Sequence, residues 1–274
     1  MFSALKTKEK QSAFTLVELL VVVAVLALLA SIVFSNLTGA REQAKISNAL
    51  SFQSNMHNLL GADLVGWWNF DEGTGSVAKD LSGYGNNGTL SGSHYVGDSP
   101  SSNGYSLSFD GSNNVKINNF SHTTQGITVG AWIKTLGTGE GNRYDSIVRR
   151  WYPGFLFAIM ENVESNAGRI RVYLWDDHEG SLTGITAIND NRWHYVMFTW
   201  DSGGTVDIYV DGKIDQSKTD FSINKTIEMN GIIYIGSNFN GLIDDVRIYS
   251  RALTAYEVQT LYAQTKGNYL VEDI

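Results

Sequence analysis

The chain has 274 residues, and its 20 Lys and Arg against 28 Asp and Glu give a formal net charge of −8. The basic residues form no stripe of the kind that binds a phosphate backbone, so we expect no nucleic acid partner for the exported part. The absence of cysteine excludes a disulfide framework. The length suits one large domain with an additional element, and 28 Gly with 12 % aromatic residues is typical of short strands joined by tight turns.

An apolar segment runs from Phe14 to Phe34 and follows a short leader that contains Lys6, Lys8 and Lys10. With about 21 residues, this segment is long enough to cross a hydrocarbon core of ~30 Å as a helix. A positive leader stays in the cytoplasm, which predicts a single-pass protein of the inner (cytoplasmic) membrane with its C-terminal domain outside. A cleavable secretory signal peptide would have a shorter apolar run.

One ionisable residue, Glu18, lies within the apolar segment. A charge at the centre of a membrane-spanning helix costs at least ~2.5 kcal/mol, so a partner for Glu18 is expected. The surrounding sequence, Ala13-Phe14-Thr15-Leu16-Val17-Glu18-Leu19-Leu20, resembles the processing site of type IV prepilins and pseudopilins, although that family usually has Gly at position 13. The resemblance implies that prepilin peptidase cleaves between Ala13 and Phe14, that the new amine of Phe14 is methylated, and that Glu18 binds the amine of a neighbouring pilin-like subunit during assembly. The alternative is an uncleaved single-span anchor.

Apolar residues keep helical spacing between Ser35 and Leu60, which predicts a helical stem that continues from the membrane segment. Gly61 and Asp63 provide signals for its end. Such a stem would contact other stems in a filament, or would serve only as a spacer next to the membrane. The predicted organisation is a leader at 1–13, a transmembrane and assembly helix at 14–34, a stem at 35–63, a β domain at 64–265 and a C-terminal tail at 266–274.

Beyond Leu64, short apolar or alternating runs recur between turn clusters, which indicates an all-β sandwich. The predicted strands are Leu64–Phe70, Ser106–Phe109, Val115–Ile117, Ile127–Lys134, Ser146–Arg149, Phe155–Met160, Arg169–Trp175, Trp193–Trp200, Val206–Val210, Ile232–Gly236 and Leu242–Tyr249. A short helix, Ala255–Gln264, is predicted to close the domain, and Thr254 and Glu257 have the spacing of a capping box.

Several motifs of this region resemble the laminin-G-like superfamily, in the bacterial branch related to pentraxins and concanavalin A-like lectins. In chain order they are Gly66-Trp67-Trp68-Asn69-Phe70-Asp71-Glu72-Gly73, Asp80-Leu81-Ser82-Gly83-Tyr84-Gly85-Asn86-Asn87-Gly88, Leu107-Ser108-Phe109-Asp110-Gly111, Val129-Gly130-Ala131-Trp132-Ile133, Trp193-His194-Tyr195, Tyr209-Val210-Asp211-Gly212 and Gly241-Leu242-Ile243-Asp244-Asp245-Val246-Arg247-Ile248-Tyr249-Ser250-Arg251-Ala252-Leu253. The resemblance implies a mainly β fold, an antiparallel jelly-roll sandwich carried on the long N-terminal helix.

The same resemblance implies one structural Ca²⁺, because related sandwiches commonly use this ion to join the first strand, an early turn and the start of the last strand. Carried over, its ligands would be Asn69 or Asp71, the carbonyl oxygen of Gly111, and Asp244. Strand alternation places Asp245 on the opposite face from Asp244, where it would be the alternative ligand. Oxygen ligands of these kinds suit Ca²⁺. The alternative is that the acidic side chains only accept hydrogen bonds from turn backbones.

Catalysis is not predicted. Glycoside hydrolysis needs a pair of suitably spaced carboxylates, and we find no strand that would provide one, nor a G-x-S-x-G or H-E-x-x-H motif. His194 is predicted to be a packing residue rather than a base. Glycan binding is the better hypothesis, with Trp151 and Tyr152 as one aromatic platform and Trp175 as another. The tryptophans within other strand segments are predicted to lie in the core: Trp67, Trp132, Trp193 and Trp200.

The sequence thus predicts a type IV pilin-like surface subunit that displays a lectin-like sandwich for adhesion, through binding of a glycan or a surface protein. After processing, it would move from the cytoplasmic membrane to the cell surface or a pilus. A second hypothesis is a pseudopilin or minor tip subunit of a secretion or DNA-uptake system. A third is a membrane-anchored, glycan-active enzyme.

Overall fold

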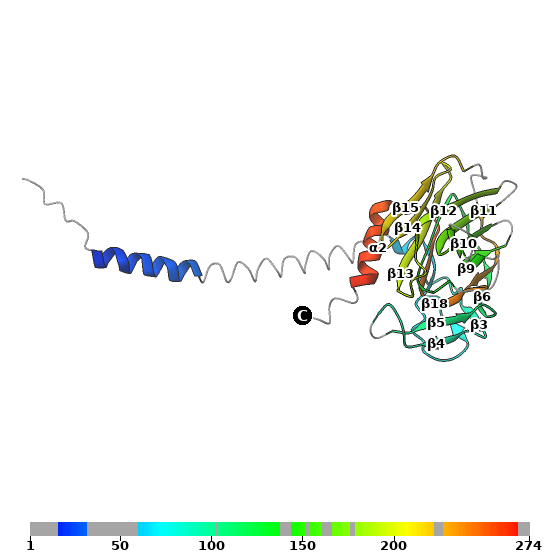
Figure 1. Ribbon diagram of the computed structural model, residues 1–274, viewed down its shortest axis with the longest axis horizontal. Helices are drawn as coiled ribbons and strands as arrows, with labels where there is room; N and C mark the ends of the chain where they lie inside the picture. Colours follow the sequence, from blue (N-terminus) through cyan, green and yellow to red (C-terminus); the bar gives the residue numbers. More distant parts are fainter. Residues whose placement is uncertain are drawn as a thin grey trace, which may run out of the picture. The chain divides into compact units, whose positions relative to one another are not determined.

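The computed structural model describes residues 16–31, 60–101, 104–137, 144–151, 154–160, 166–175, 179–221 and 227–267. The chain divides into two units, Met1–Asn58 and Leu59–Ile274. In the first unit, residues 16–31 form a helix, drawn in blue in Figure 1. No helix in the described ranges is both long and apolar enough to cross a membrane. The predicted cleavage site at Ala13 and Phe14 and residues 35–59 of the predicted stem lie outside the described residues.

The second unit is an antiparallel β-sandwich of two eight-stranded sheets (Figure 1). Sheet A has the strand order β15 (Lys213–Lys218), β14 (Val206–Val210), β13 (His194–Asp201), β8 (Gly126–Lys134), β18 (Asn240–Tyr249), β5 (Ser106–Asp110) and β4 (His94–Val96), and β1 (Leu64–Trp68) also pairs with β18. Sheet B has the order β12 (Glu179–Ala187), β11 (Arg169–Trp175), β10 (Gly154–Met160), β9 (Tyr144–Arg150), β17 (Gly231–Ile235), β6 (Asn114–Phe120), β3 (Gly88–Ser91) and β2 (Val77–Ala78). A small ribbon joins β7 (Thr123–Thr124) to β16 (Ile227–Glu228), and the helix α2 spans Ala255–Gly267.

The core lies between the two sheets and follows from the alternation of side chains along each strand. In β8 of sheet A, Val129, Ala131 and Ile133 point inward, and in β10 of sheet B, Phe155 and Phe157 do so. All of these side chains are almost completely buried and belong to one hydrophobic cluster. Burial of a large apolar side chain contributes about 1.5–3 kcal/mol. This layer therefore holds the sandwich together without disulfides.

Every strand predicted from the sequence is present, and their ends differ by only a few residues. The strands that the sequence analysis missed are short or lie toward the sheet edges: β2, β3, β4, β7, β12, β15 and β16. Edge strands bury less surface and so carry a weaker apolar pattern. The Asp211-Gly212 turn between β14 and β15 has φ values of 50° and 73°, as a two-residue hairpin turn with matching twist requires.

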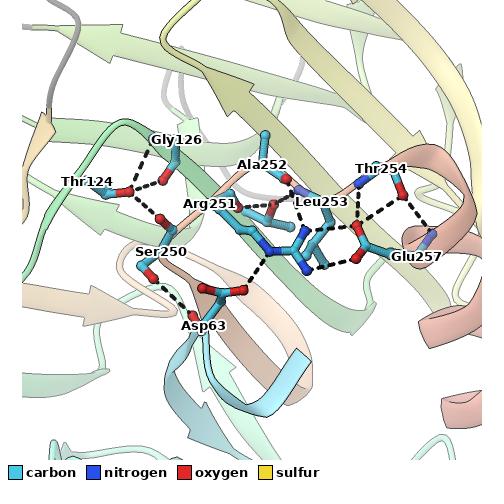
Figure 2. Close-up of polar contacts among 10 residues, drawn as sticks. Asp63, Thr124, Gly126, Ser250, Arg251, Ala252, Leu253, Thr254 and Glu257 are labelled. Atoms are coloured by element: carbon cyan, nitrogen blue, oxygen red, sulfur yellow. Dashed lines mark hydrogen bonds and ion pairs between the residues drawn. The ribbon is translucent and has the colours of Figure 1, made fainter. Parts of the chain in front are cut away.

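Arg251 follows β18, and its guanidinium contacts both the segment before β1 and the helix α2 (Figure 2). Its Nε donates to Asp63 Oδ2 at 2.6 Å, immediately before β1, and its Nη1 and Nη2 donate to the Glu257 carboxylate at 2.9 and 2.7 Å. Glu257 also belongs to the predicted capping box, which is confirmed: Thr254 N–H donates to Glu257 Oε2 at 2.8 Å, and Glu257 N–H to Thr254 Oγ1 at 3.3 Å. One guanidinium thus joins the beginning of the first strand to the first turn of α2.

Replacing Glu257 by Gln is expected to lower the free energy of unfolding of the sandwich on the order of 1–2 kcal/mol at neutral pH, since a charged hydrogen bond is lost at a site partly screened by water. The hydrogen bonds from Arg251 lower the pKa of Glu257 from 4.5 to about 2. Because the folded-state pKa is depressed, this stabilisation is complete above about pH 4.5 and is lost as the pH falls toward 2. Glu257→Gln should therefore lose less stability between pH 5 and pH 3 than the parent.

The measurement is urea unfolding of the full chain in detergent, followed by tryptophan fluorescence, which reports on the sandwich because all 7 Trp lie beyond residue 66. Asp220→Asn removes an exposed carboxylate and serves as the matched control. Equal pH dependence for Glu257→Gln and Asp220→Asn would contradict the assigned role of Arg251.

Candidate functional site

Two outer faces of the sandwich carry the residues that the sequence singled out. On sheet A, a pocket of about 120 Å³ opens beside β1, β8 and β18, and we call it the carboxylate pocket. Trp132 shows that it lies on the outer face, since this residue alternates with the inward-pointing Ala131 and Ile133. The lining residues are Trp67, Asn69, Asp71, Ser101, Trp132, Asp244, Asp245, Arg247 and Thr265.

A β-bulge in β18 brings both neighbouring aspartates to the carboxylate pocket. Asp244 pairs with Trp132 and Arg247 with Gly130, so two residues of β18 face only one of β8. Asp245 is the first of these two and has a φ of 46°. The prediction that Asp244 and Asp245 lie on opposite faces is therefore wrong, because a bulge interrupts the alternation on which it depended.

The charges of the pocket are only partly balanced. Asp245 Oδ1 accepts from Trp67 Nε1 at 2.7 Å and from Arg247 Nε at 3.0 Å, and the Arg247 guanidinium lies 4.7 Å from the centroid of the Trp67 ring. Burial, followed by the charge of Asp245, raises the pKa of Asp244 well above its ordinary value. Burial also raises the pKa of Asp71. One guanidinium thus lines the pocket with three carboxylates, two of which, Asp71 and Asp244, have raised pKa values.

The pocket has the oxygen-rich chemistry that Ca²⁺ prefers, but the described side chains do not form a complete ligand set. Both oxygens of Asp71 accept hydrogen bonds, Oδ2 from Asn69 Nδ2 at 2.6 Å and Oδ1 from Tyr105 N–H at 3.1 Å. Gly111 does not line the pocket, and its N–H donates to the Phe239 carbonyl at 2.8 Å. Within the described ranges, no three His, Cys, Asp or Glu side chains are grouped so that they could hold a metal ion. Calcium binding stays a prediction.

The outer face of sheet B carries a second group of side chains, which we call the aromatic–arginine face: Tyr144, Arg149, Trp151, Arg171, Tyr173, Trp175 and Tyr234. The strand register places them together, since Tyr234 of β17 pairs with Arg149 of β9, Arg149 pairs with Leu156 of β10, and Leu156 pairs with Tyr173 of β11. Directly paired residues point to the same side of a sheet. Leu156 and Ala158 turn outward from β10 but are 8 % and 0 % exposed, because larger neighbours cover them.

Two arginines organise the rings of this face. The Arg149 guanidinium lies 4.4 Å from the centroid of Trp151 and 5.5 Å from that of Tyr234. The Arg171 guanidinium lies 4.7 Å from the centroid of Tyr173. Cation–π contacts at these distances hold the rings and the guanidinium groups in fixed mutual positions.

Hydroxyl groups complete the second of these clusters. Arg171 Nη2 donates to Tyr173 Oη at 3.0 Å and to Ser181 Oγ at 2.9 Å, and its Nη1 donates to the hydroxyl of Thr183. Tyr144 Oη and Tyr173 Oη are 3.0 Å apart and share a hydrogen bond. The face therefore combines flat rings with hydrogen-bonding groups.

The structure places the predicted ligand-binding residues as follows. Trp151 is 59 % exposed and Trp175 is half-buried, with its ring centroid 6.2 Å from that of Tyr173, so both belong to one face rather than to two platforms. Tyr152 lies outside the described residues. The sequence analysis missed Tyr144, Arg171, Tyr173 and Tyr234. The alternation in Arg169–Trp175, where every second residue is Arg, Tyr or Trp, is a signal that could have found part of this set.

Four further tryptophans were predicted to lie in the core. Trp132 and Trp200 are buried, but Trp67 and Trp193 are only half-buried, and for these two the prediction is wrong. Both point outward and donate to aspartates, Trp67 to Asp245 and Trp193 to Asp98 Oδ1 at 2.9 Å. An indole N–H can thus position a tryptophan at the surface of the sheet.

His194 lies between two carboxylates rather than near a nucleophile. Its Nδ1 is 2.9 Å from Asp211 Oδ2, and its Nε2 is 3.1 Å from Asp190 Oδ1. The hydrogen bond with Asp211 raises the pKa of His194, which favours the doubly protonated ring. With both ring nitrogens engaged, the interactions of His194 are structural.

Comparison with known proteins identifies the two parts of the chain. Residues 109–259 match the family described as the concanavalin A-like lectin/glucanases superfamily, and residues 8–34 match the prokaryotic N-terminal methylation motif. Among curated proteins, the sushi, von Willebrand factor type A, EGF and pentraxin domain-containing protein 1 of Rattus norvegicus is 24 % identical over 177 residues, 54 % of this chain and 4 % of the rat protein. Its Mus musculus counterpart is 26 % identical over 116 residues, 35 % of this chain and 3 % of that protein. The chain thus spans only a few per cent of these relatives.

Solved structures with the same fold include carbohydrate complexes. Domain 4 of AbnA, a GH43 extracellular arabinanase from Geobacillus stearothermophilus, in complex with arabinotriose, has a TM-score of 0.56 and 20 % identity, covering 73 % of this chain and 98 % of that one. The ligand binding domain of botulinum neurotoxin serotype D in complex with N-acetylneuraminic acid has a TM-score of 0.60 and 17 % identity, covering 76 % and 52 %. At these identities the likeness shows the fold alone. The matched family covers more than half of the sequence, and the chain belongs to the concanavalin A-like lectin/glucanases superfamily, with a prokaryotic N-terminal methylation motif at its N-terminal end.

Proposed function

We propose that this protein is a type IV pilin-like subunit that carries its sandwich to the cell surface, where the aromatic–arginine face binds carbohydrate. The observation that carries the proposal is the difference between the two outer faces. On sheet A, Tyr262 of α2 lies over Trp132 and Tyr195, with ring centroids 5.9 and 6.2 Å away. On sheet B, the described residues include no helix over the face, and Trp151 is exposed.

The chemistry of the aromatic–arginine face suits a sugar. A pyranose or furanose ring has an apolar C–H face that can stack on an aromatic ring, and its hydroxyls can bind the hydroxyl and guanidinium groups beside that ring. Trp151 is exposed and the other rings of the face are half-buried, so each keeps part of its surface accessible to a ligand. The known structures with bound arabinotriose and N-acetylneuraminic acid support carbohydrate binding by this fold.

We propose binding rather than catalysis for this surface. Glycoside hydrolysis requires two carboxylates on either side of the scissile bond, and among the described strands of sheet B the register puts one acidic residue on this face, Glu179, which pairs with Trp175. The carboxylates gather instead at the carboxylate pocket, on the outer face of the other sheet.

Delivery to the surface rests on the N-terminal methylation motif. In this proposal prepilin peptidase removes residues 1–13, the membrane holds the subunit before assembly, and Glu18 joins it to neighbouring pilin-like subunits. Glu18 lies within the described helix at 16–31.

Glu18→Ala is expected to leave membrane insertion intact and to abolish incorporation into surface filaments, because the carboxylate that binds the neighbouring amine is lost. The measurement is quantification of the protein in sheared filaments and in membranes by immunoblotting. Glu18→Asp keeps the charge and is the matched control, which should retain part of the incorporation. Unchanged filament yield for Glu18→Ala would refute assembly through this residue.

Trp151→Ala is expected to weaken carbohydrate binding at least tenfold, which corresponds to ~1.4 kcal/mol, because the most exposed ring of the face is removed. The assay is binding of the full chain in detergent to a panel of immobilised neutral and acidic polysaccharides. Tyr256→Ala is the control, since Tyr256 is 61 % exposed but belongs to α2, on the side of sheet A. The melting temperature should stay unchanged in both variants. Carbohydrate binding that persists in Trp151→Ala would place the site elsewhere.

A further inference from the structure

Resting on the proposed function, we infer that the aromatic–arginine face selects acidic polysaccharides, with Arg149 and Arg171 binding carboxylate or sulfate groups of the ligand. Both arginines differ in one property from Arg247 and Arg251 on the rest of the sandwich. Neither forms an ion pair with any carboxylate among the described residues, whereas Arg247 pairs with Asp245 at 3.0 Å and Arg251 pairs with Asp63 and Glu257.

The chain is rich in acidic residues, with 28 Asp and Glu against 20 Lys and Arg, so a described carboxylate beside each arginine would be the ordinary expectation. Two cations on one face without an ion pair to a described carboxylate are therefore a local feature of a molecule with a net charge of −8. The register of the described strands puts one acidic residue on this side of sheet B, Glu179, and pairs it with Trp175 rather than with either arginine. A negatively charged ligand would meet a favourable potential at this face.

Arg149 is held in place before any ligand arrives. The rings of Trp151 and Tyr234 lie near its guanidinium, and burial lowers its pKa. A half-buried cation is incompletely hydrated, so an anion that binds it recovers electrostatic energy that water does not supply. The planar guanidinium also presents paired N–H donors that match a carboxylate or a sulfate.

Among the described residues, the hydrogen-bond partners of the Arg171 guanidinium are neutral hydroxyl groups. Tyr173 and Ser181 accept hydrogen bonds from its Nη2, and Thr183 accepts one from its Nη1. These hydroxyls orient the guanidinium without neutralising it. Its positive charge remains available at the surface.

The spacing of the two arginines favours a polymer over a single acidic sugar. Arg149 and Tyr173 lie in one row on β9 and β11, separated by β10, so their backbones are ~10 Å apart. Arg171 lies two residues along β11, a further ~7 Å in the strand direction. Together these offsets put the two backbones ~12 Å apart, which favours a ligand longer than one sugar unit. A chain that carries acidic groups on successive sugars can reach both guanidinium groups, and the rings of Tyr144 and Tyr173 lie along its path.

The test compares two forms of one polymer. Polygalacturonate carries a carboxylate on each sugar, and its fully methyl-esterified form keeps the backbone without the charge. The full chain in detergent should bind polygalacturonate at least tenfold more tightly than the ester, and this difference should shrink as salt is added. Arg149→Gln and Arg171→Gln should each weaken binding of polygalacturonate at least fivefold and change binding of the ester less than twofold. Arg149→Lys should give an intermediate loss, because it keeps the charge without the paired donors.

Arg192→Gln is the matched control, since it removes one positive charge at a side chain that is 82 % exposed and lies on the turn before β13. An equal effect of Arg192→Gln would overturn the inference in favour of non-specific attraction. Equal affinity for polygalacturonate and its ester, with no effect of the arginine variants, would overturn the inference and leave carbohydrate binding standing. Binding of chondroitin sulfate but not polygalacturonate, if lost in both arginine variants, would support the inference and assign sulfate as the anion. Binding of poly-glutamate alone would overturn both the inference and the proposed function.

Discussion

The apolar layer between sheets A and B decides which side chains remain available for other tasks. Because residues alternate along each strand, a sequence that places Phe155 and Phe157 in the core must turn Leu156 and Ala158 outward. Each sheet therefore has an inner face whose side chains must be apolar to form the core, and an outer face whose side chains can be of other types. Because the chain has no cysteine, no disulfide joins the two sheets. The apolar pattern of the inward residues must therefore continue through both sheets.

The outer faces of sheets A and B carry different kinds of side chains and contacts. The helix α2 and the bulge of β18 convert the outer face of sheet A into a closed arrangement in which Trp67, Asp245 and Arg247 bind one another around a small pocket. The outer face of sheet B presents Arg149 and Arg171 with rings and hydroxyls as their described partners. The outer face of sheet A is thus covered in part by α2 and carries mainly carboxylates, whereas the outer face of sheet B carries cations and an exposed ring, Trp151.

The sequence predicted the class of fold and all of the long interior strands, because a strand with one buried face, such as Arg169–Trp175, shows its alternation directly. The short interior strand β3 was missed. It also predicted the capping box of α2, a purely local signal. It could not predict the position of Asp245, since a bulge depends on pairing between strands far apart in the chain. Nor could it assemble Tyr234 with Arg149, which are 85 residues apart by their numbers, because register between non-neighbouring strands is a property of the folded sheet. Trp67 and Trp193 were predicted to be core residues because the hydrophobicity of a tryptophan does not show whether its indole N–H donates to an aspartate in the folded sheet.

The contacts of Asp63 have a mechanical consequence. Asp63 immediately precedes β1, and its carbonyl accepts from Ser250 N–H at 2.8 Å while its carboxylate binds Arg251. Tension applied through the chain before Leu64 would pull β1 lengthwise against β18, so that their hydrogen bonds resist in shear and share the force. The ion pair of Asp63 with Arg251 lies at the point where that force enters, and it couples the load to the end of the last strand. A domain displayed on a filament in flowing liquid would gain from this geometry, since bonds loaded in parallel yield less readily than bonds opened one after another.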